Sequence, residues 1–148
     1  MSNLIVVRGI PGSGKSSFSN TMFPGTIHLE NDMFHYRNGE YRFDYRNLRK
    51  AIKLCNDTAE TWISCGCDVV VSNTFTKRSF VEAYRQIAEK HKANFVVYRM
   101  MGEFQNIHNV PKDVLENMKN GFEEYPKEIL VFPTVDEDLK PTYSFRYT

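Results

Sequence analysis

The amino-acid sequence predicts an α/β fold of three layers, in which helices cover both faces of a parallel sheet of four or five strands. Short runs of apolar, mostly β-branched residues alternate along the chain with longer segments whose apolar residues recur every three or four positions. The short runs are typical of strands buried on both faces, and the longer segments are typical of amphipathic helices. Strands that alternate with helices in this way form parallel sheets through right-handed crossovers.

Five short segments have the pattern of strands. The second segment is followed by Glu30-Asn31-Asp32, so we expect Asp32 to lie just beyond the end of a strand. The expected strands cover residues 3–8, 26–29, 68–71, 95–98 and 129–135.

Three segments have the pattern of amphipathic helices. The longest covers residues 46–66 and ends at Gly66, and the second covers residues 80–91. The third follows Pro111, a residue suited to the first turn of a helix, and reaches Phe122. The proline and aromatic residues beyond Asp138 are expected to form a tail on the surface.

The composition indicates one folded domain that covers residues 1–148. With 41% hydrophobic residues and a formal net charge of +1, the chain is neither disordered nor a nucleic-acid binder that works by bulk positive charge. The three cysteines lack zinc-site spacing, so we expect reduced core thiols. No apolar run approaches the about 18 residues that span a membrane, which favours a cytoplasmic protein without membrane contact.

One motif carries a specific chemical prediction. The segment Gly9-Ile10-Pro11-Gly12-Ser13-Gly14-Lys15-Ser16 matches G-x-x-x-x-G-K-[ST] at every fixed position and follows the first strand. A chance match in a glycine-rich turn is the alternative, and it is rare. The motif predicts a P-loop for ATP, with Lys15 at the β- and γ-phosphates and Ser16 on Mg²⁺. The predicted nucleotide-binding residues are Gly9, Gly12, Ser13, Gly14, Lys15, Ser16 and Ser17.

A carboxylate near the P-loop is needed if the γ-phosphate moves to a hydroxyl. Asp32 is the best candidate for this general base, because the ends of parallel strands share one edge of the sheet. On the residues alone, a cap for a helix beginning at Met33 is an equally good interpretation. The strand at 68–71 is followed by Ser72 and Asn73, where a Walker-B aspartate would stand, so switch GTPases and motor ATPases are disfavoured.

Basic and aromatic residues interleave between positions 34 and 53. Arginines bind phosphates and aromatic rings stack on bases, so this segment is a candidate acceptor site. A solvated basic helix face with a core-packing aromatic strip remains open as the alternative. Lys77 and Arg78 also have two interpretations: they bind an acceptor phosphate, or they are simply exposed. The interleaved residues are Arg37, Arg42, Arg46, Arg49, Lys50 and Lys53 with Tyr36, Tyr41, Phe43 and Tyr45.

Taken together, these motifs resemble those of the polynucleotide-kinase-like P-loop kinases, over nearly the whole chain. The resemblance rests on the P-loop, on Leu29-Glu30-Asn31-Asp32, on Tyr41-Arg42-Phe43-Asp44, on Val71-Ser72-Asn73-Thr74 with Arg78, and on Asn106-Ile107-His108-Asn109-Val110-Pro111. It implies a P-loop NTPase fold, transfer of the ATP γ-phosphate to a hydroxyl, Asp32 as the general base, and a helical lid at about 102–125. Arg37, Thr74 and Arg78 are the acceptor-binding residues that we assign with it.

Two departures from the family pattern bear on turnover. Gln105 stands where the family usually has an arginine, and Ser72 stands where many members have an aspartate. We therefore expect a phosphotransferase that acts on the 5'-hydroxyl of a polynucleotide end, with two alternatives. One is a small-molecule kinase for a nucleoside, nucleotide or modified base. The other is an inactive nucleotide-binding module, which Gln105 and Ser72 favour.

Overall fold

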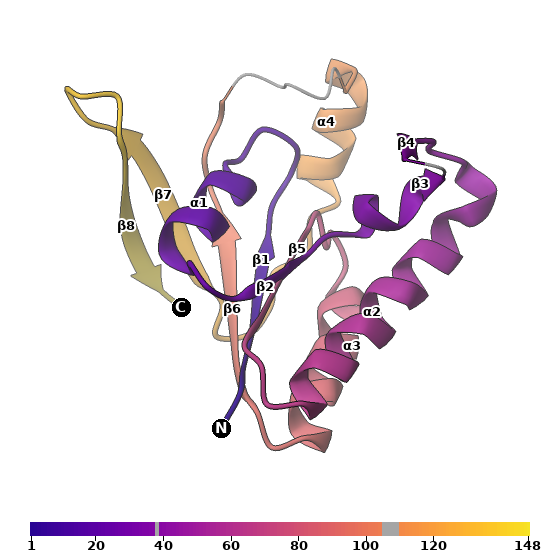
Figure 1. The fold of residues 1–148 in the computed structure, drawn as a ribbon. Helices are drawn as coiled ribbons and strands as arrows, with labels where there is room; N and C mark the ends of the chain where they lie inside the picture. Colours follow the sequence, from indigo (N-terminus) through magenta and orange to yellow (C-terminus); the bar gives the residue numbers. More distant parts are fainter. Residues whose placement is uncertain (38, 105–109) are drawn as a thin grey trace.

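A six-stranded sheet runs through the middle of the protein (Figure 1), in the order β2-β5-β1-β6-β7-β8. The computed structural model describes residues 1–37, 39–104 and 110–148. The first five strands in this order are parallel to their neighbours, and β8 is antiparallel to β7. The strands are β1 (Asn3–Arg8), β2 (Ile27–Leu29), β5 (Val69–Asn73), β6 (Asn94–Met100), β7 (Ile129–Val135) and β8 (Pro141–Tyr147).

Helices lie on both faces of the sheet, which confirms the predicted three-layer α/β class. Helices α2 and α3 cover one face and α1 covers the other (Figure 1). A small hairpin of two strands extends beside the start of α2. The helices are α1 (Lys15–Met22), α2 (Leu48–Ser64), α3 (Arg78–Lys90) and α4 (Lys112–Asn120), with 3₁₀ turns η1 (Asn31–His35) and η2 (Tyr45–Asn47); the hairpin strands are β3 (Tyr36–Arg37) and β4 (Glu40–Tyr41).

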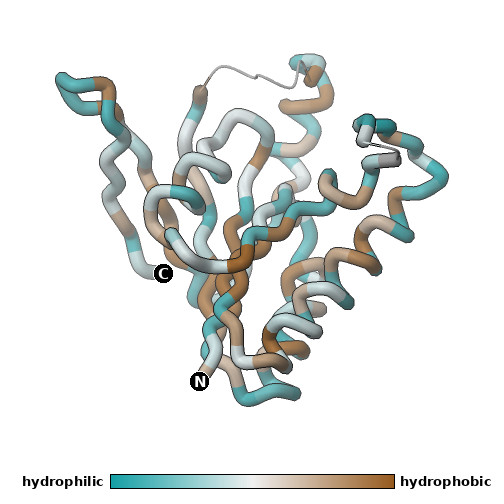
Figure 2. Tube along the Cα trace, in the orientation of Figure 1, coloured by the Kyte–Doolittle hydropathy of each residue, from teal (hydrophilic) through white to brown (hydrophobic). Residues whose placement is uncertain are grey.

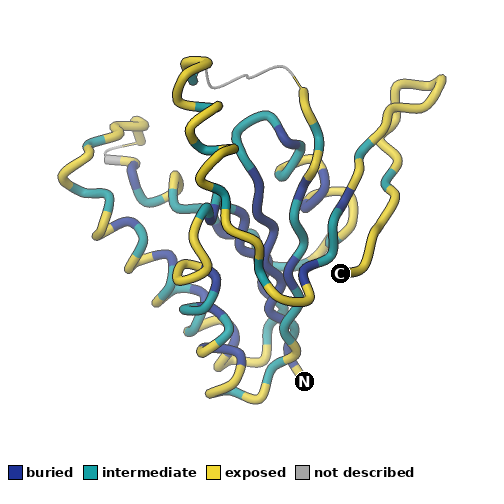
Figure 3. The backbone as a smooth tube through the Cα atoms, turned by 180° about the vertical axis from the view of Figure 1, so that it is seen from behind, coloured by how far each residue is buried: buried dark blue, intermediate teal, exposed yellow. Residues whose placement is uncertain are grey.

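Hydrophobic residues are concentrated in the central strands, as Figure 2 shows, and the same strands are the most buried part of the chain (Figure 3). Helix α4 has no buried residue, and the tip of the β7–β8 hairpin is exposed. Helix α4 therefore stands over one edge of the sheet instead of packing into the core. Within the described residues, we find no helix that is long and apolar enough to cross a bilayer.

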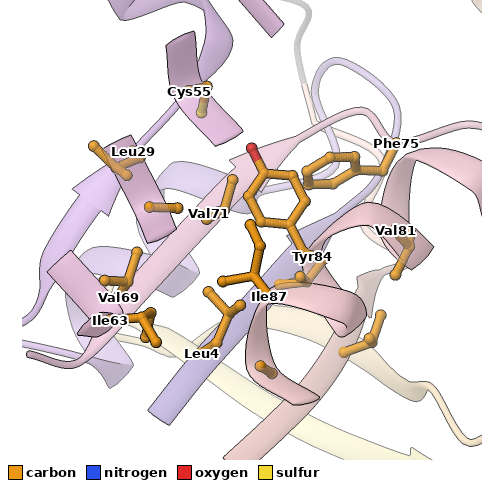
Figure 4. Packing of buried hydrophobic residues seen from close by; sticks show 14 residues of the cluster. Leu4, Leu29, Cys55, Ile63, Val69, Val71, Phe75, Val81, Tyr84 and Ile87 are labelled. Carbon is orange, nitrogen blue, oxygen red and sulfur yellow. The ribbon is translucent and has the colours of Figure 1, made fainter. Parts of the chain in front are cut away.

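Strand β1 supplies both halves of the core. Leu4 and Val6 face α2 and α3, in the cluster shown in Figure 4, where Tyr84 and Ile87 of α3 close over the sheet. Ile5 and Val7 face the opposite side, where Phe18 of α1 is fully buried. Alternate residues of one strand thus enter opposite clusters, which explains why its apolar run is continuous.

Two expectations from the sequence are wrong. The residues beyond Asp138 do not form a surface tail, because Pro141–Tyr147 pair with β7 along its whole length and add a sixth strand to the sheet. Tyr143 of this strand packs edge-on against Phe18, with ring centroids 4.9 Å apart. The cysteines are all free, but only Cys55 is a core thiol; Cys65, at the end of α2, is exposed.

Candidate active site

The P-loop connects β1 to α1 through a tight turn. Gly12 and Gly14 have φ of 82° and 97°, a region that favours glycine because other residues are strained there. The amide of Ser13 donates to Ile10 O at 3.2 Å, which closes the turn. Ser13 is buried, and Ser17 is exposed on the first turn of α1. The predicted nucleotide-binding residues therefore form one continuous loop and helix start, as such motifs require.

Lys15 lies inside this loop. Its Nζ donates to the carbonyl oxygens of Gly9 at 2.9 Å and Ile10 at 3.1 Å. Burial lowers the pKa of Lys15 from 10.5 to about 8, and the negative charges of Glu30 and Asp32 partly oppose this shift. The ammonium group is thus held by neutral carbonyls at the place where phosphate oxygens would stabilise it more strongly.

The end of β2 brings two carboxylates to the P-loop edge. Glu30 accepts a hydrogen bond from the Ser16 hydroxyl at 3.4 Å. Asp32 is exposed and accepts from the Tyr41 hydroxyl at 3.5 Å. Neither contact was predicted from the sequence, although Tyr41 belongs to the aromatic segment that it singled out.

Asp32 is not a helix cap. It lies inside η1, whose N-cap residue is Glu30, and no side chain caps this turn. The turn is fixed by Asn73 at the end of β5, whose Oδ1 accepts from the Asn31 amide at 2.7 Å. The Asn31 and Asn73 side chains bond to each other as well, at 3.3 Å. Asn73, which follows Ser72 at the position of the absent Walker-B aspartate, thus holds the segment that carries Asp32.

The three predicted acceptor-binding residues lie in different places. Arg37 is in β3, opposite Glu40. The carbonyl of Thr74 accepts from the Gly9 amide at 3.3 Å, so this residue supports the P-loop through its backbone. Arg78 begins α3, where its Nε donates to Glu124 O at 2.5 Å and its amide donates to the Glu123 carboxylate at 2.8 Å. Of these three residues, only Thr74 hydrogen-bonds to the P-loop in the described part of the chain.

The first residues of the predicted lid cover the P-loop from the β6 side. The amide of Phe104 donates to Gly12 O at 2.8 Å, and a side chain at Gly14 would meet the Phe104 ring. Beside them lies a cavity of about 310 Å³ between the P-loop and α4, lined in part by Pro11, Leu115 and Lys119. A larger cavity of about 750 Å³ lies elsewhere, between α3 and the turn before β7. Gln105 and His108 lie outside the described residues.

The residues that return from α4 to β7 are anchored under the P-loop strand by a buried charge cluster. Arg8, the last residue of β1, is fully buried and pairs with Glu128 at 2.8 Å. The guanidinium groups of Arg8 and Arg99 both lie over the Phe122 ring, 4.3 and 4.4 Å from its centroid. Burial lowers the pKa of Arg8, and Glu128 opposes that shift. The base of the predicted lid is thus tied to the strand that precedes the P-loop.

Comparison with known proteins places the chain in a family. It matches the AAA_33 family model, described as an AAA domain, over residues 4–101. The chain belongs to the AAA_33 family. NEDD4-binding protein 2 of Homo sapiens is 27% identical over 152 residues, which cover 93% of this chain and 8% of that protein. The chain therefore spans less than a tenth of the length of this relative.

Solved kinases share the fold of this AAA_33 domain. The APS kinase CysC of Mycobacterium tuberculosis superposes with a TM-score of 0.62 at 15% identity, covering 91% of this chain and 90% of that one. A chain of the Pnkp1/Rnl/Hen1 complex has a TM-score of 0.58 at 16% identity, covering 95% of this chain and 44% of that one. These likenesses show a P-loop kinase fold.

The oxygen donors at the site fit a magnesium ion. Mg²⁺ in nucleotide sites takes most of its ligands from phosphates and water and only one or two from protein side chains. The Ser16 hydroxyl and the Glu30 carboxylate are hard oxygen donors of this kind. No group of three or more histidine, cysteine or acidic side chains that would hold a metal without a nucleotide occurs among the described residues.

Proposed function

We propose that this AAA_33 domain transfers the γ-phosphate of Mg·ATP to a hydroxyl, and that its acceptor is the 5'-hydroxyl of a polynucleotide. The observation that carries the proposal is the exposed carboxylate of Asp32, at the same sheet edge as Lys15 and beside an aromatic hairpin. In this proposal, residues 1–148 act as one domain and residues 102–125 form the lid.

The roles of the residues follow from charge and position. The P-loop amides and Lys15 bind the phosphates, and Ser16 would hold the Mg²⁺, which would supply positive charge to offset that of the phosphates. Asp32 accepts the proton of the acceptor hydroxyl while the oxygen of that hydroxyl bonds to the γ-phosphorus. The bond from that phosphorus to the bridging oxygen breaks, and ADP leaves with the electron pair. Tyr41 orients the Asp32 carboxylate through its hydroxyl.

The hairpin beside Asp32 supports a polynucleotide acceptor. Tyr36 of the hairpin, and Phe43 and Tyr45 just after it, are 57%, 54% and 78% exposed, so they do not form a core-packing strip. Exposed rings can stack on bases, each with a contribution of about 1–3 kcal/mol. Arg49 and Lys50 extend from the first turn of α2 and form no ion pair with any residue that the structure describes. They are available for phosphates.

A small-molecule acceptor is the second candidate. Solved structures with this fold include a sugar kinase from Janibacter sp. HTCC2649 and an APS kinase. The same scaffold therefore accommodates acceptors without a polynucleotide chain.

Acceptor length decides between the candidates. We would measure transfer from labelled ATP to 5'-hydroxyl acceptors of one, three and ten nucleotides, with a 5'-phosphorylated ten-mer as the control. A polynucleotide site predicts that KM falls with length and that the control is not labelled at its 5' end. Tyr45→Ala should raise KM for the ten-mer more than for the mononucleotide. Equal KM at every length would favour the small-molecule kinase, and ATP binding without transfer to any acceptor would favour the inactive module.

A further inference from the structure

The strand that usually carries the magnesium carboxylate of a P-loop enzyme has none here. Strand β5 ends in Ser72 and Asn73, and positions 74–79 contain no acidic residue. Ser72 is 6% exposed, and the Asn73 side chain is used by Asn31. If the domain binds Mg·ATP, a carboxylate for the metal has to come from another strand.

Glu30 occupies the required place. It follows the buried Leu29 at the end of β2, which pairs with β5, the neighbour of β1. Its Oε1 lies 3.4 Å from Ser16 Oγ, the P-loop hydroxyl that is predicted to bind magnesium. Oxygen ligands at adjacent corners of a magnesium octahedron lie about 3.0 Å apart, because each bond is about 2.1 Å long. A small adjustment would let both oxygens share one ion, directly or through its water.

The carboxylate of Glu30 is also not neutralised by a nearby cation among the described residues. It forms no ion pair within 4 Å with a described residue, while its field reaches Lys15. The charge of Asp32, two residues later, also reaches Lys15, but its carboxylate accepts a hydrogen bond from Tyr41 of the hairpin. The two carboxylates are therefore aimed at different partners, Glu30 at the P-loop hydroxyl and Asp32 toward solvent and the acceptor side.

We infer that Glu30 supplies the magnesium carboxylate of this domain, in place of the missing aspartate at the end of β5. The inference rests on nucleotide binding at the P-loop, which is one part of the proposed function, and is independent of the acceptor. It assigns different tasks to two neighbouring acidic residues: Glu30 holds the metal and Asp32 moves the proton.

The test compares nucleotide binding with and without metal, using AMPPNP, Mg²⁺ and calorimetry. In the parent, Mg²⁺ should strengthen AMPPNP binding. In Glu30→Gln, the increase in AMPPNP affinity caused by Mg²⁺ should be at least tenfold smaller than in the parent. Its affinity in EDTA should equal that of the parent or be slightly higher, since a negative charge has been removed. Asp32→Asn is the matched control, because it neutralises a carboxylate on the same turn, and it should keep the gain. Electron paramagnetic resonance of Mn²⁺ should agree: Glu30→Gln should hold less Mn²⁺ in the ternary complex than the parent, and Asp32→Asn should hold as much as the parent.

The outcomes are separable. A Glu30→Gln protein that is folded and keeps the full gain would overturn the inference, and so would an equal loss in Asp32→Asn. Recovery of the gain in a Glu30→Gln/Ser72→Asp double variant would support it, because the carboxylate would return to the end of β5. A parent that binds no AMPPNP with or without Mg²⁺ would refute the proposed function itself, and the inference with it.

Discussion

Lys15 connects the electrostatics of the free loop to nucleotide binding. Its pKa is lowered to about 8 chiefly by burial, so the free protein loses this charge as the pH rises through about 8. Bound phosphates favour the ammonium form and raise its pKa. Above pH 8, nucleotide binding is therefore coupled to the uptake of a proton by Lys15.

We predict that AMPPNP affinity falls as the pH rises from 7 to 9.5, and that binding at pH 8.5 takes up a fraction of a proton. Calorimetry in two buffers with different ionisation enthalpies measures this uptake, since the nucleotide phosphates are already deprotonated there. Lys15→Ala should remain folded, bind far more weakly and show no uptake. An affinity that is constant over this pH range would contradict the assignment.

At Asp32 we predict a separation of chemistry from binding. Asp32→Asn should keep ATP affinity within a few-fold, because the carboxylate hydrogen-bonds to Tyr41 and to no P-loop group in the described part of the chain, and should lower kcat by about 10² or more, the usual contribution of a positioned base. Tyr41→Phe removes only the hydrogen bond at 3.5 Å, so its effect on kcat should be smaller. Transfer at the parent rate by Asp32→Asn would exclude it as the base.

Among the elements, the connection from α4 back to β7 depends on the buried pair of Arg8 and Glu128. Glu128 accepts from the Arg8 guanidinium and from the Tyr125 amide at 2.9 Å, while Phe75 O accepts from Arg8 as well. Three separate segments therefore meet at one guanidinium. The cluster contacts the end of the proposed lid at Phe122 and Glu123 and lies outside the predicted nucleotide-contact residues.

Glu128→Gln should lower the free energy of unfolding by about 3–5 kcal/mol, because it leaves the buried charge of Arg8 without its counter-ion. Asp57→Asn is the matched control: it breaks the exposed Lys53–Asp57 pair on α2 and should cost no more than about 0.5 kcal/mol. Urea denaturation measures both. Equal effects in the two variants would show that the buried pair has no special weight.

For the molecule as a whole, strand β8 decides where the sheet ends. It covers the outer edge of β7, and its Tyr143 adds to the aromatic cluster of Phe18, Phe23 and Tyr98. The last residues of the chain thus contribute to the core on the α1 side.

Tyr143→Ala should lower the free energy of unfolding by about 1–2 kcal/mol, because a half-buried ring leaves the Phe18 cluster. Tyr147→Ala, on the same strand but 77% exposed, should stay within about 0.5 kcal/mol of the parent. Thermal and urea unfolding provide the measurement. If the two variants lose equal stability, β8 acts through its backbone pairing and not through Tyr143.

Local patterns were enough to predict much of this protein. The apolar periods located the main strands and helices, since burial on one or two faces leaves a trace in neighbouring residues. The loop between β1 and α1 was located from the sequence because its glycines, Lys15 and Ser16 lie within eight residues and its conformation depends on the local backbone; its contacts with a nucleotide stay a prediction. The position of Asp32 beyond a strand also followed from its immediate neighbours.

Only the tertiary structure decided which distant residues meet. The contact of Glu30 with Ser16, the link from Asn31 to Asn73, and the pairing of Arg8 with Glu128, 120 residues away, depend on strand order and on where chain segments return. Strand β8 was missed for the same reason, because an exposed edge strand with a proline and polar residues lacks a buried-strand pattern and is defined by its partner. Sequence determined the chemistry that one segment carries, and the packing of separated segments determined which carboxylate meets the P-loop.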